Sequence, residues 1–248
     1  MTPKRTALNL GLAAAAVVAS STVAVAATGF SISPSIAQTT AAAGASTSVT
    51  INNSTGRPLK VAVHARPWSQ ARSGTVAANR RRRLGGVTVS ATGFTMATGT
   101  TRSVKVTLNG LPASKSLFGA LEVVGRPVKK GKGISVAYRL IPSLRFNPRS
   151  GARKLSLSAG TAKVASRTVV LPVRNRGNTV DPVSGSVSIT GSGSGRSGGL
   201  RSVRILPGKT VNFDLTARKG LRAGSYTATV SLRQGGKTTK VTRRFRVG

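Results

Sequence analysis

Acidic residues are almost absent from this chain of 248 residues, in which three Asp and Glu stand against 39 Lys and Arg. The three acids, Glu122, Asp181 and Asp214, are too few and too scattered to supply both a catalytic carboxylate pair and a calcium site. The formal net charge of +36 instead favours contact with polyanions such as anionic wall polymers, lipid head groups or nucleic acid. A purely compositional origin of the charge stays open as the alternative.

Cysteine is also absent, and histidine occurs once, at His64. The chain therefore has no cysteine nucleophile and no disulfide, and it cannot form a metal cluster based on histidine. Its one G-x-S-x-G match, Gly195 to Gly199, lies in a Gly/Ser-rich stretch without the strand and helix that a nucleophile elbow requires. We expect no enzymatic activity, no catalytic or metal-binding residues and no cofactor.

Helical periodicity is missing beyond the N-terminal 27 residues. Short runs that alternate apolar with polar residues recur instead, bounded by Gly, Pro and Asn, and this pattern is typical of an all-β protein. In the clearest run, Tyr226 to Leu232, every second residue is apolar, and Gln234-Gly235-Gly236 then turns the chain into a hairpin. Similar runs predict strands at 49–52, 59–65, 87–91, 103–108, 120–124, 134–140, 154–158, 167–173, 186–190, 203–206 and 210–215.

The first 27 residues have the layout of a secretory signal peptide. Lys4 and Arg5 precede an uncharged run rich in Ala and Val, and small residues stand at Ala24 and Ala26. The alternative is a permanent membrane anchor, which the low leucine content disfavours. We therefore expect an extracytoplasmic protein, secreted or associated with the cell envelope, that contacts a membrane only if this segment is uncleaved.

The remaining chain is long enough for two domains. We predict two tandem Ig-like β-sandwich domains at 28–141 and 153–248, joined by a Pro-containing linker at 142–152. Both halves run from a strand through an Asn/Gly turn into a second strand, which is weak evidence of duplication. Two segments, 66–86 and 191–199, lack a strand pattern and are expected to be flexible loops.

The first of these loops contains the most concentrated charge, NRRRRLGG at 79–86. A polyanion-binding surface is predicted from this run and from the Lys-rich segment that follows the strand at 120–124; its residues are Arg80, Arg81, Arg82, Arg83, Lys129, Lys130 and Lys132. A solvated loop tip is an equally weighted alternative. Because the chain has only nine aromatic residues, base stacking is disfavoured and nucleic acid is the weaker partner.

Four other residues have a structural interpretation that outweighs a functional one. His64 alternates with apolar neighbours and is expected to face solvent, and Trp68 is expected to cover one end of a sandwich. Glu122 is expected to pair with a neighbouring arginine on the sheet. Asp181 precedes Pro182 and is expected to form a turn.

Several segments together resemble the tandem Ig-like domains of bacterial WxL-interacting cell-surface proteins and, more distantly, those of pilus chaperones. The resemblance covers nearly all of residues 29–247 and is carried by GFSISPSIAQTTAAAGASTSVTINNSTGRPLKVAVHA, VTVSATGFTMATGTTRSVKVTLNG, SLFGALEVVG, GISVAYRLIPSL, VRNRGNTVDPVSGSVSI, ILPGKTVNFDLTA and LRAGSYTATVSL. It implies a first domain associated with peptidoglycan and a second associated with partner or host proteins. The family's usual C-terminal membrane helix has no counterpart before Gly248.

The function that these observations favour is a non-enzymatic envelope-associated binding or adhesion protein. Its partners would be an anionic cell-wall polymer or peptidoglycan, or another surface protein that adds a strand to an exposed sheet edge. Two alternatives stay open: a secreted general polyanion binder, and a chaperone-like carrier of surface-fibre subunits.

Overall fold

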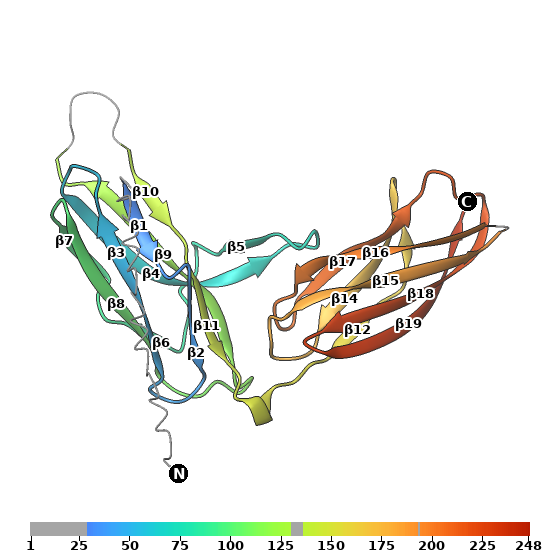
Figure 1. The fold of residues 1–248 in the computed structure, drawn as a ribbon, viewed down its shortest axis with the longest axis horizontal. Coiled ribbons are helices and arrows are strands. Elements are labelled where there is room, and N and C mark those ends of the chain that lie inside the picture. The colour runs from blue at the N-terminus through green and yellow to red at the C-terminus, as the bar shows by residue number, and fades with distance from the viewer. Residues whose placement is uncertain (1–28, 130–135, 193) are drawn as a thin grey trace, which may run out of the picture.

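The chain folds into two β-sandwiches set at an angle to each other, with the C-terminus at the far end of the second (Figure 1). This computed structural model describes residues 29–129, 136–192 and 194–248. The described part is all-β apart from one 3-10 turn, η1 (Ser150–Ala152). The predicted fold class, two tandem Ig-like sandwiches, is confirmed. The signal peptide predicted at 1–27 lies outside the described residues.

The first sandwich consists of two sheets. Four strands form one sheet, in the order β1 (Phe30–Ser33), β3 (Ser46–Asn53), β8 (Thr100–Leu108), β6 (Val87–Val89). The other has the order β2 (Ile36–Thr40), β11 (Ser143–Asn147), β9 (Leu117–Pro127), β4 (Leu59–Gln70), β5 (Val76–Ala78), with β10 (Tyr138–Leu140) on β9 and β7 (Gly93–Met96) on β4. The N-terminal segment thus crosses from one sheet to the other, and β2 pairs with β11 in parallel.

The second sandwich is built from two four-stranded sheets. One contains β12 (Leu157–Ala159), β14 (Thr168–Asn175), β13 (Lys163–Val164) and β17 (Thr210–Ala217). The other has the order β16 (Ser194–Arg204), β15 (Pro182–Gly191), β18 (Gly224–Gln234), β19 (Lys237–Val247). The predicted hairpin is confirmed as β18 and β19, and the alternating residues Tyr226, Ala228, Val230 and Leu232 are all buried.

Each sandwich has its own apolar core, filled by the alternating residues of facing strands. Val49 and Ile51 of β3 and Val61 and Val63 of β4 are buried in the first core. Burial of such residues, at about 25 cal/mol per Å² of apolar surface, is the main stabilising contribution in a chain without disulfides. In the second sandwich the hydroxyl of Tyr226 donates a hydrogen bond to the Arg222 carbonyl at 3.0 Å. This is the tyrosine-corner contact of Ig-like folds.

The two sandwiches repeat one buried polar contact, which agrees with the internal similarity of the two halves. Asn53 and Asn175, both fully buried, each end a strand at the Asn/Gly turn. The side-chain oxygen of each accepts the backbone N–H two residues later, from Thr55 and Gly177, at 3.2 and 2.8 Å. The side-chain amide of each donates to backbone carbonyls of the neighbouring loops.

The two segments expected to be flexible loops differ in outcome: 66–86 contains strands at 66–70 and 76–78 and is otherwise turn and loop, whereas the described part of 191–199 is mostly strand. Residues 66–70 continue β4, and its last three residues pair with β5, which makes a hairpin that reaches the second sandwich (Figure 1). Residues 194–199 begin β16 and pair along β15. Backbone pairing with a regular neighbouring strand overrides the low strand propensity of Gly and Ser there.

The segment between the sandwiches is shorter than the predicted linker at 142–152. Ser143–Asn147 forms β11, which pairs with both β2 and β9 of the first sandwich. The turn η1 follows, and Arg153 then forms an ion pair with Asp181 at 2.9 Å. The exact limits of the domains stay a prediction.

Candidate functional site: an open strand edge and a basic junction pocket

The first candidate site is the outer edge of β10. Its inner edge pairs with β9, and in the described part of the chain no strand pairs with its outer edge. Tyr138 and Leu140 point toward the core but stay half-buried, and Tyr138 contacts the Phe30 ring with centroids 5.9 Å apart. Val136 and Ile141, on either side of the strand, are 54% and 40% exposed. This edge combines free backbone groups with uncovered apolar side chains, and such an edge readily accepts an added strand.

The second candidate site is a pocket of about 210 Å³ where the two sandwiches meet. Its walls are mainly apolar, and the outer face of the first sandwich supplies most of them. The lining includes Trp68 of β4, Val76 of β5, Phe118 of β9, Arg145 of β11, and Arg204 and Leu206 of the second sandwich. β11 therefore connects the two candidate sites, because it follows β10 directly and carries Arg145 into the pocket.

Arg145 and Arg204 give this pocket its chemistry. Arg145 donates from Nε to the Ser143 hydroxyl at 3.3 Å, and Arg204 donates from Nη1 to the Val180 carbonyl at 2.8 Å. Partial burial, together with the positive charge of Arg204, lowers the pKa of Arg145. Within the described ranges neither guanidinium has a carboxylate in ion-pair contact, so both keep N–H groups for an anion such as a carboxylate.

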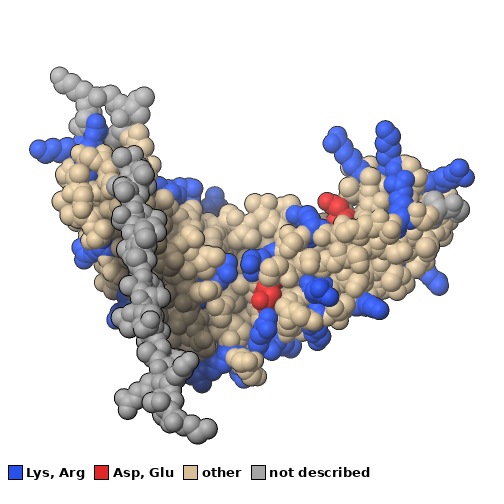
Figure 2. Space-filling view, viewed as in Figure 1, with Lys and Arg blue, Asp and Glu red and all other residues tan. Residues whose placement is uncertain are grey.

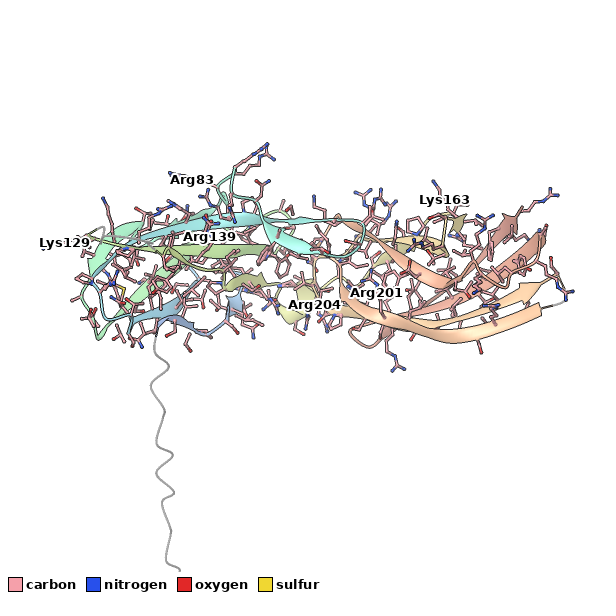
Figure 3. All side chains as sticks on the ribbon, turned by 90° about the horizontal axis from the view of Figure 1, so that it is seen from above. Arg83, Lys129, Arg139, Lys163, Arg201 and Arg204 are labelled. Carbon is pink, nitrogen blue, oxygen red and sulfur yellow. The ribbon has the colours of Figure 1, made fainter. Side chains whose placement is uncertain are left out.

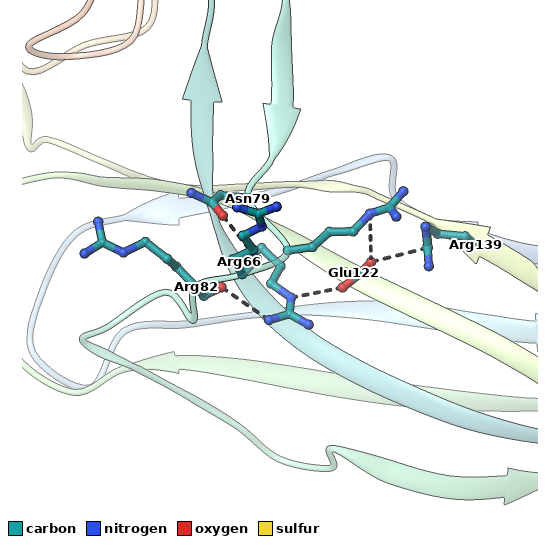
Figure 4. Close-up of polar contacts among 7 residues, drawn as sticks. Arg66, Asn79, Arg82, Glu122 and Arg139 are labelled. Carbon is teal, nitrogen blue, oxygen red and sulfur yellow. Dashed lines mark hydrogen bonds and ion pairs between the residues drawn. The ribbon is translucent and has the colours of Figure 1, made fainter.

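The third feature is a buried carboxylate surrounded by arginines on the outer face of the same sheet (Figure 4). Glu122 of β9 is 3% exposed and contacts Arg66 at 2.9 Å, Arg139 at 3.3 Å and Arg80 at 3.7 Å. The expected pairing of Glu122 with a neighbouring arginine is therefore found, with two further arginines from β10 and the basic loop. One carboxylate against three guanidiniums leaves this cluster strongly positive.

The basic loop around Arg80 to Arg83 is held in place by its backbone. The N–H of Asn79 donates to the Pro67 carbonyl at 2.8 Å, and that of Leu84 donates to the Ala65 carbonyl at 2.9 Å. Arg66 also donates to the Arg82 carbonyl at 3.3 Å. All four arginines are exposed, but only Arg80 is in ion-pair contact with a described carboxylate.

The described members of the predicted polyanion-binding set, Arg80 to Arg83 and Lys129, lie in two separate places (Figure 3). Arg83 projects from the loop, whereas Lys129, also exposed, lies at the end of the first sandwich far from the junction (Figure 3). Lys130 and Lys132 lie outside the described residues. Basic side chains are spread over both sandwiches, with acidic atoms visible only in small patches on the face shown (Figure 2).

The other residues singled out from the sequence have structural surroundings. Half-exposed His64 lies opposite Glu122, and burial followed by the charge of Arg66 lowers its pKa. Trp68 lies in the hairpin of β4 and β5, opposite Ala78, and lines the junction pocket. Asp181 precedes β15; burial by itself would raise its pKa, but hydrogen bonds with Arg153 and Thr179 lower it.

The described residues contain no group of three or more His, Cys, Asp or Glu suited to hold a metal ion. They also contain no helix with the length and apolar character needed to cross a membrane.

Sequence reasoning missed Arg145 and Arg204. Arg145 alternates with Leu144 and Phe146, both buried, so the pattern does place its side chain on the outer face. Nothing in the sequence shows that it meets a residue of the other sandwich, because this proximity exists only after both domains have docked.

The fold is similar to that of known proteins. No protein-family model matches the chain, and no curated protein matches it. The chain is similar to a chain of a chaperone–tip adhesin complex described as vital for activation of CFA/I fimbriae biogenesis, with a TM-score of 0.56 at 15% identity. It is also similar to the class 5 fimbriae chaperone CfaA, with a TM-score of 0.55 at 16% identity. Each alignment covers 86% of this chain and 98% of the other.

At this identity the likeness establishes the fold alone. The distant resemblance to pilus chaperones is confirmed at that level. The resemblance to WxL-interacting proteins gains no support from these structures.

Proposed function

We propose that this protein is a non-enzymatic, chaperone-like carrier that binds a partner domain through the open edge of β10, outside the cytoplasm. The observation that carries this proposal is the outer edge of β10, with which no described strand pairs, together with the exposed side chains of Val136 and Ile141 and the half-buried ones of Tyr138 and Leu140. A partner domain that lacks one strand of its own would gain both backbone hydrogen bonds and an apolar cover from this edge.

The binding mode follows from the position of the two candidate sites along the chain. An extended segment pairs with β10, and its apolar side chains pack beside Tyr138 and Leu140. The segment then runs along the face that carries β11 toward the junction pocket, where Arg145 and Arg204 bind a carboxylate. Paired guanidiniums beside apolar walls suit a carboxylate because they supply several directed donors where little water competes.

The structural neighbours favour this carrier function over wall-polymer binding. They are a fimbriae chaperone and a chaperone–tip adhesin complex, and this chain shares their two-domain fold. A surface-fibre subunit is accordingly the class of partner that we propose. An extracytoplasmic location agrees with the predicted signal peptide.

The test is binding of a fluorescein-labelled, ten-residue peptide that alternates apolar residues with Thr and ends in a free carboxylate. We expect Val136→Asp to weaken binding of the peptide about tenfold, because a charged side chain then faces the apolar side chains of the bound peptide. Val136 is exposed, so the protein should fold normally, as thermal unfolding will verify. The control is Thr242→Asp, which adds the same charge at an exposed position of the edge strand β19 of the second sandwich and should bind as the unmodified protein does. Equal losses in both variants would instead indicate non-specific adsorption and overturn the proposal.

A second candidate function belongs to the basic loop. Arg81, Arg82 and Arg83 are exposed and have no described carboxylate partner, while the loop backbone is fixed at both ends. We propose that these three arginines make a secondary contact with an anionic polymer. Arg80 is excluded from this contact, because Glu122 already holds it.

A further inference from the structure

The hairpin of β4 and β5 leaves the first sandwich and docks on the second. Its strands pair from Trp68↔Ala78 to Gln70↔Val76, and its tip is residues 71–75. The tip is closed by two backbone bonds of 2.9 Å, from Ala71 to Thr75 and from Gly74 to Ala71. Arg201 and Arg204, its neighbours on the second sandwich, lie where the two sandwiches meet (Figure 3).

Gln70 makes the most specific contact between the hairpin and the second sandwich. Its side-chain amide donates to the Arg204 carbonyl at 2.7 Å, and its side-chain oxygen accepts the Leu206 N–H at 2.9 Å. One side chain therefore fixes the backbone on both sides of Ile205. Both of its partners, Arg204 and Leu206, line the junction pocket.

The tip adds further contacts to β16 and β17. The Asn212 N–H donates to the Arg72 carbonyl at 2.7 Å, and Arg201 donates to the Ser73 carbonyl at 2.5 Å. Gly74 has φ +94° and approaches so closely that a Cβ would lie 2.8 Å from a methyl group of Val203. Only glycine fits here without displacing the second sandwich.

A separate contact fastens the two sandwiches at another place. Asn178 of the second sandwich donates from its side-chain amide to the Ser114 carbonyl of the first at 2.9 Å. It donates equally to the Ala152 carbonyl of the connecting segment. A single hydrogen bond beside the covalent connection is a weak restraint on rotation of the second sandwich about that connection. The hairpin supplies the second point of attachment that prevents this rotation.

We infer that the β4–β5 hairpin is a positioning element that holds Arg204 opposite Arg145, so that both guanidiniums meet one carboxylate of the partner. This inference rests on the proposed carrier function. Gln70 is a positioning residue, because it acts through Arg204 and Leu206 and is not itself part of the pocket lining. A fixed spacing of the two cations gives higher affinity because no ordering is needed when the partner binds.

The experiment measures the distance between the sandwiches and the binding of a peptide in the same variants. Because the chain has no cysteine, spin labels attached at Ser103→Cys and Thr238→Cys report one distance between exposed sites on the two sandwiches. The variants are Gln70→Leu, which removes the amide, and Gly74→Val, which forces the tip away. The control is Thr75→Ala, an exposed residue whose hydroxyl forms a hydrogen bond with Ser73 within the hairpin.

We expect a narrow distance distribution in the unmodified protein and the control, and a broad one in Gln70→Leu and Gly74→Val. The peptide with a free carboxylate should bind both variants about tenfold more weakly, whereas the same peptide with an amidated end should bind all proteins alike. Narrow distributions in both variants would overturn the inference. Broad distributions with unchanged carboxylate binding would overturn the positioning role. If neither peptide binds the unmodified protein, the carrier function fails, while the distances still decide whether the hairpin fastens the sandwiches.

Discussion

At the scale of single residues, Glu122 shows how one acid is used in a chain with very few. It lies on the central strand β9 and is contacted by arginines of β4, β10 and the basic loop. A buried carboxylate needs such partners, because an unpaired buried charge is strongly unfavourable. Through Arg139 and Arg80, Glu122 thus ties β10, the strand with the open edge, and the basic loop to the centre of the sheet.

Replacing Glu122 by Gln should lower the free energy of unfolding by roughly 1–3 kcal/mol, because three arginines then repel one another without a counter-charge. The loss stays below that of a fully enclosed ion pair because Arg80 and Arg139 reach water. Urea denaturation measures the change. Asp214→Asn, at an exposed acid of the second sandwich, is the matched control and should change stability little. Equal effects of the two substitutions would contradict a structural role for the cluster.

His64 predicts a weak dependence of stability on pH. Burial and the charge of Arg66 lower its pKa in the folded protein, so below the unfolded value of 6.5 the unfolded chain takes up the proton first. Stability should therefore fall as the pH drops through 6.5, and this loss should be complete below the folded pKa. Thermal unfolding between pH 7.5 and 5 measures the slope, and His64→Gln should flatten it. An unchanged slope in His64→Gln would show that other groups cause it.

At the scale of elements, the sequence predicts strands well where burial alternates. The strands around Val49 to Asn52 and Tyr226 to Leu232 were predictable because one face of each enters a core. β16 was not, because its first residues are mainly Gly and Ser and its place depends on pairing with β15. The outer half of β4 was missed for a related reason. Its residues 66–70, R-P-W-S-Q, show no alternation of apolar and polar residues, and pairing of the last three with β5 extends the strand.

The candidate sites were predictable to different degrees. An exposed sheet edge that accepts a partner strand follows from the strand pattern, although the pattern does not say which edge is free. The arginine partner of Glu122 also follows, because Arg66 is on the adjacent strand. The junction pocket does not, because its two arginines come from different sandwiches and meet only through the hairpin.

At the scale of the whole molecule, the positive charge is mostly unpaired. The described residues form four ion pairs, three of them with Glu122, so most Lys and Arg side chains depend on water and on ions from solution. Such a field draws anionic partners of any kind over a distance of about 10 Å at moderate salt. Specific binding must therefore be separated from this general attraction by comparing variants of equal charge.

The variant that replaces Arg81, Arg82 and Arg83 by Ser tests the basic loop in this way. Its matched control replaces Arg233, Arg244 and Arg246, exposed on the second sandwich, and so removes the same charge. If the loop is a contact site, the loop variant should flatten the salt dependence of binding to a glycerol-phosphate polymer by about 2–3 units of slope, and the control much less. Duplex DNA in parallel separates recognition of this polymer from attraction to any phosphodiester. If the salt dependence of polymer binding has the same slope in both variants, the overall positive charge alone accounts for binding and the loop is not a contact site.

The parallel pairing of β2 with β11 also determines when the first sandwich can finish folding. β2 is among the first strands to leave a ribosome or a translocation channel, whereas its partner, Ser143–Asn147, is the last strand of that sandwich. Because β11 is the only described strand that pairs with β2, β2 stays unpaired on both sides until nearly the whole domain has emerged. Such long-range closure is slow, because the ends of a long loop must be brought together before any contact forms. During biogenesis the first sandwich therefore passes through a stage in which one of its sheets lacks its closing strand.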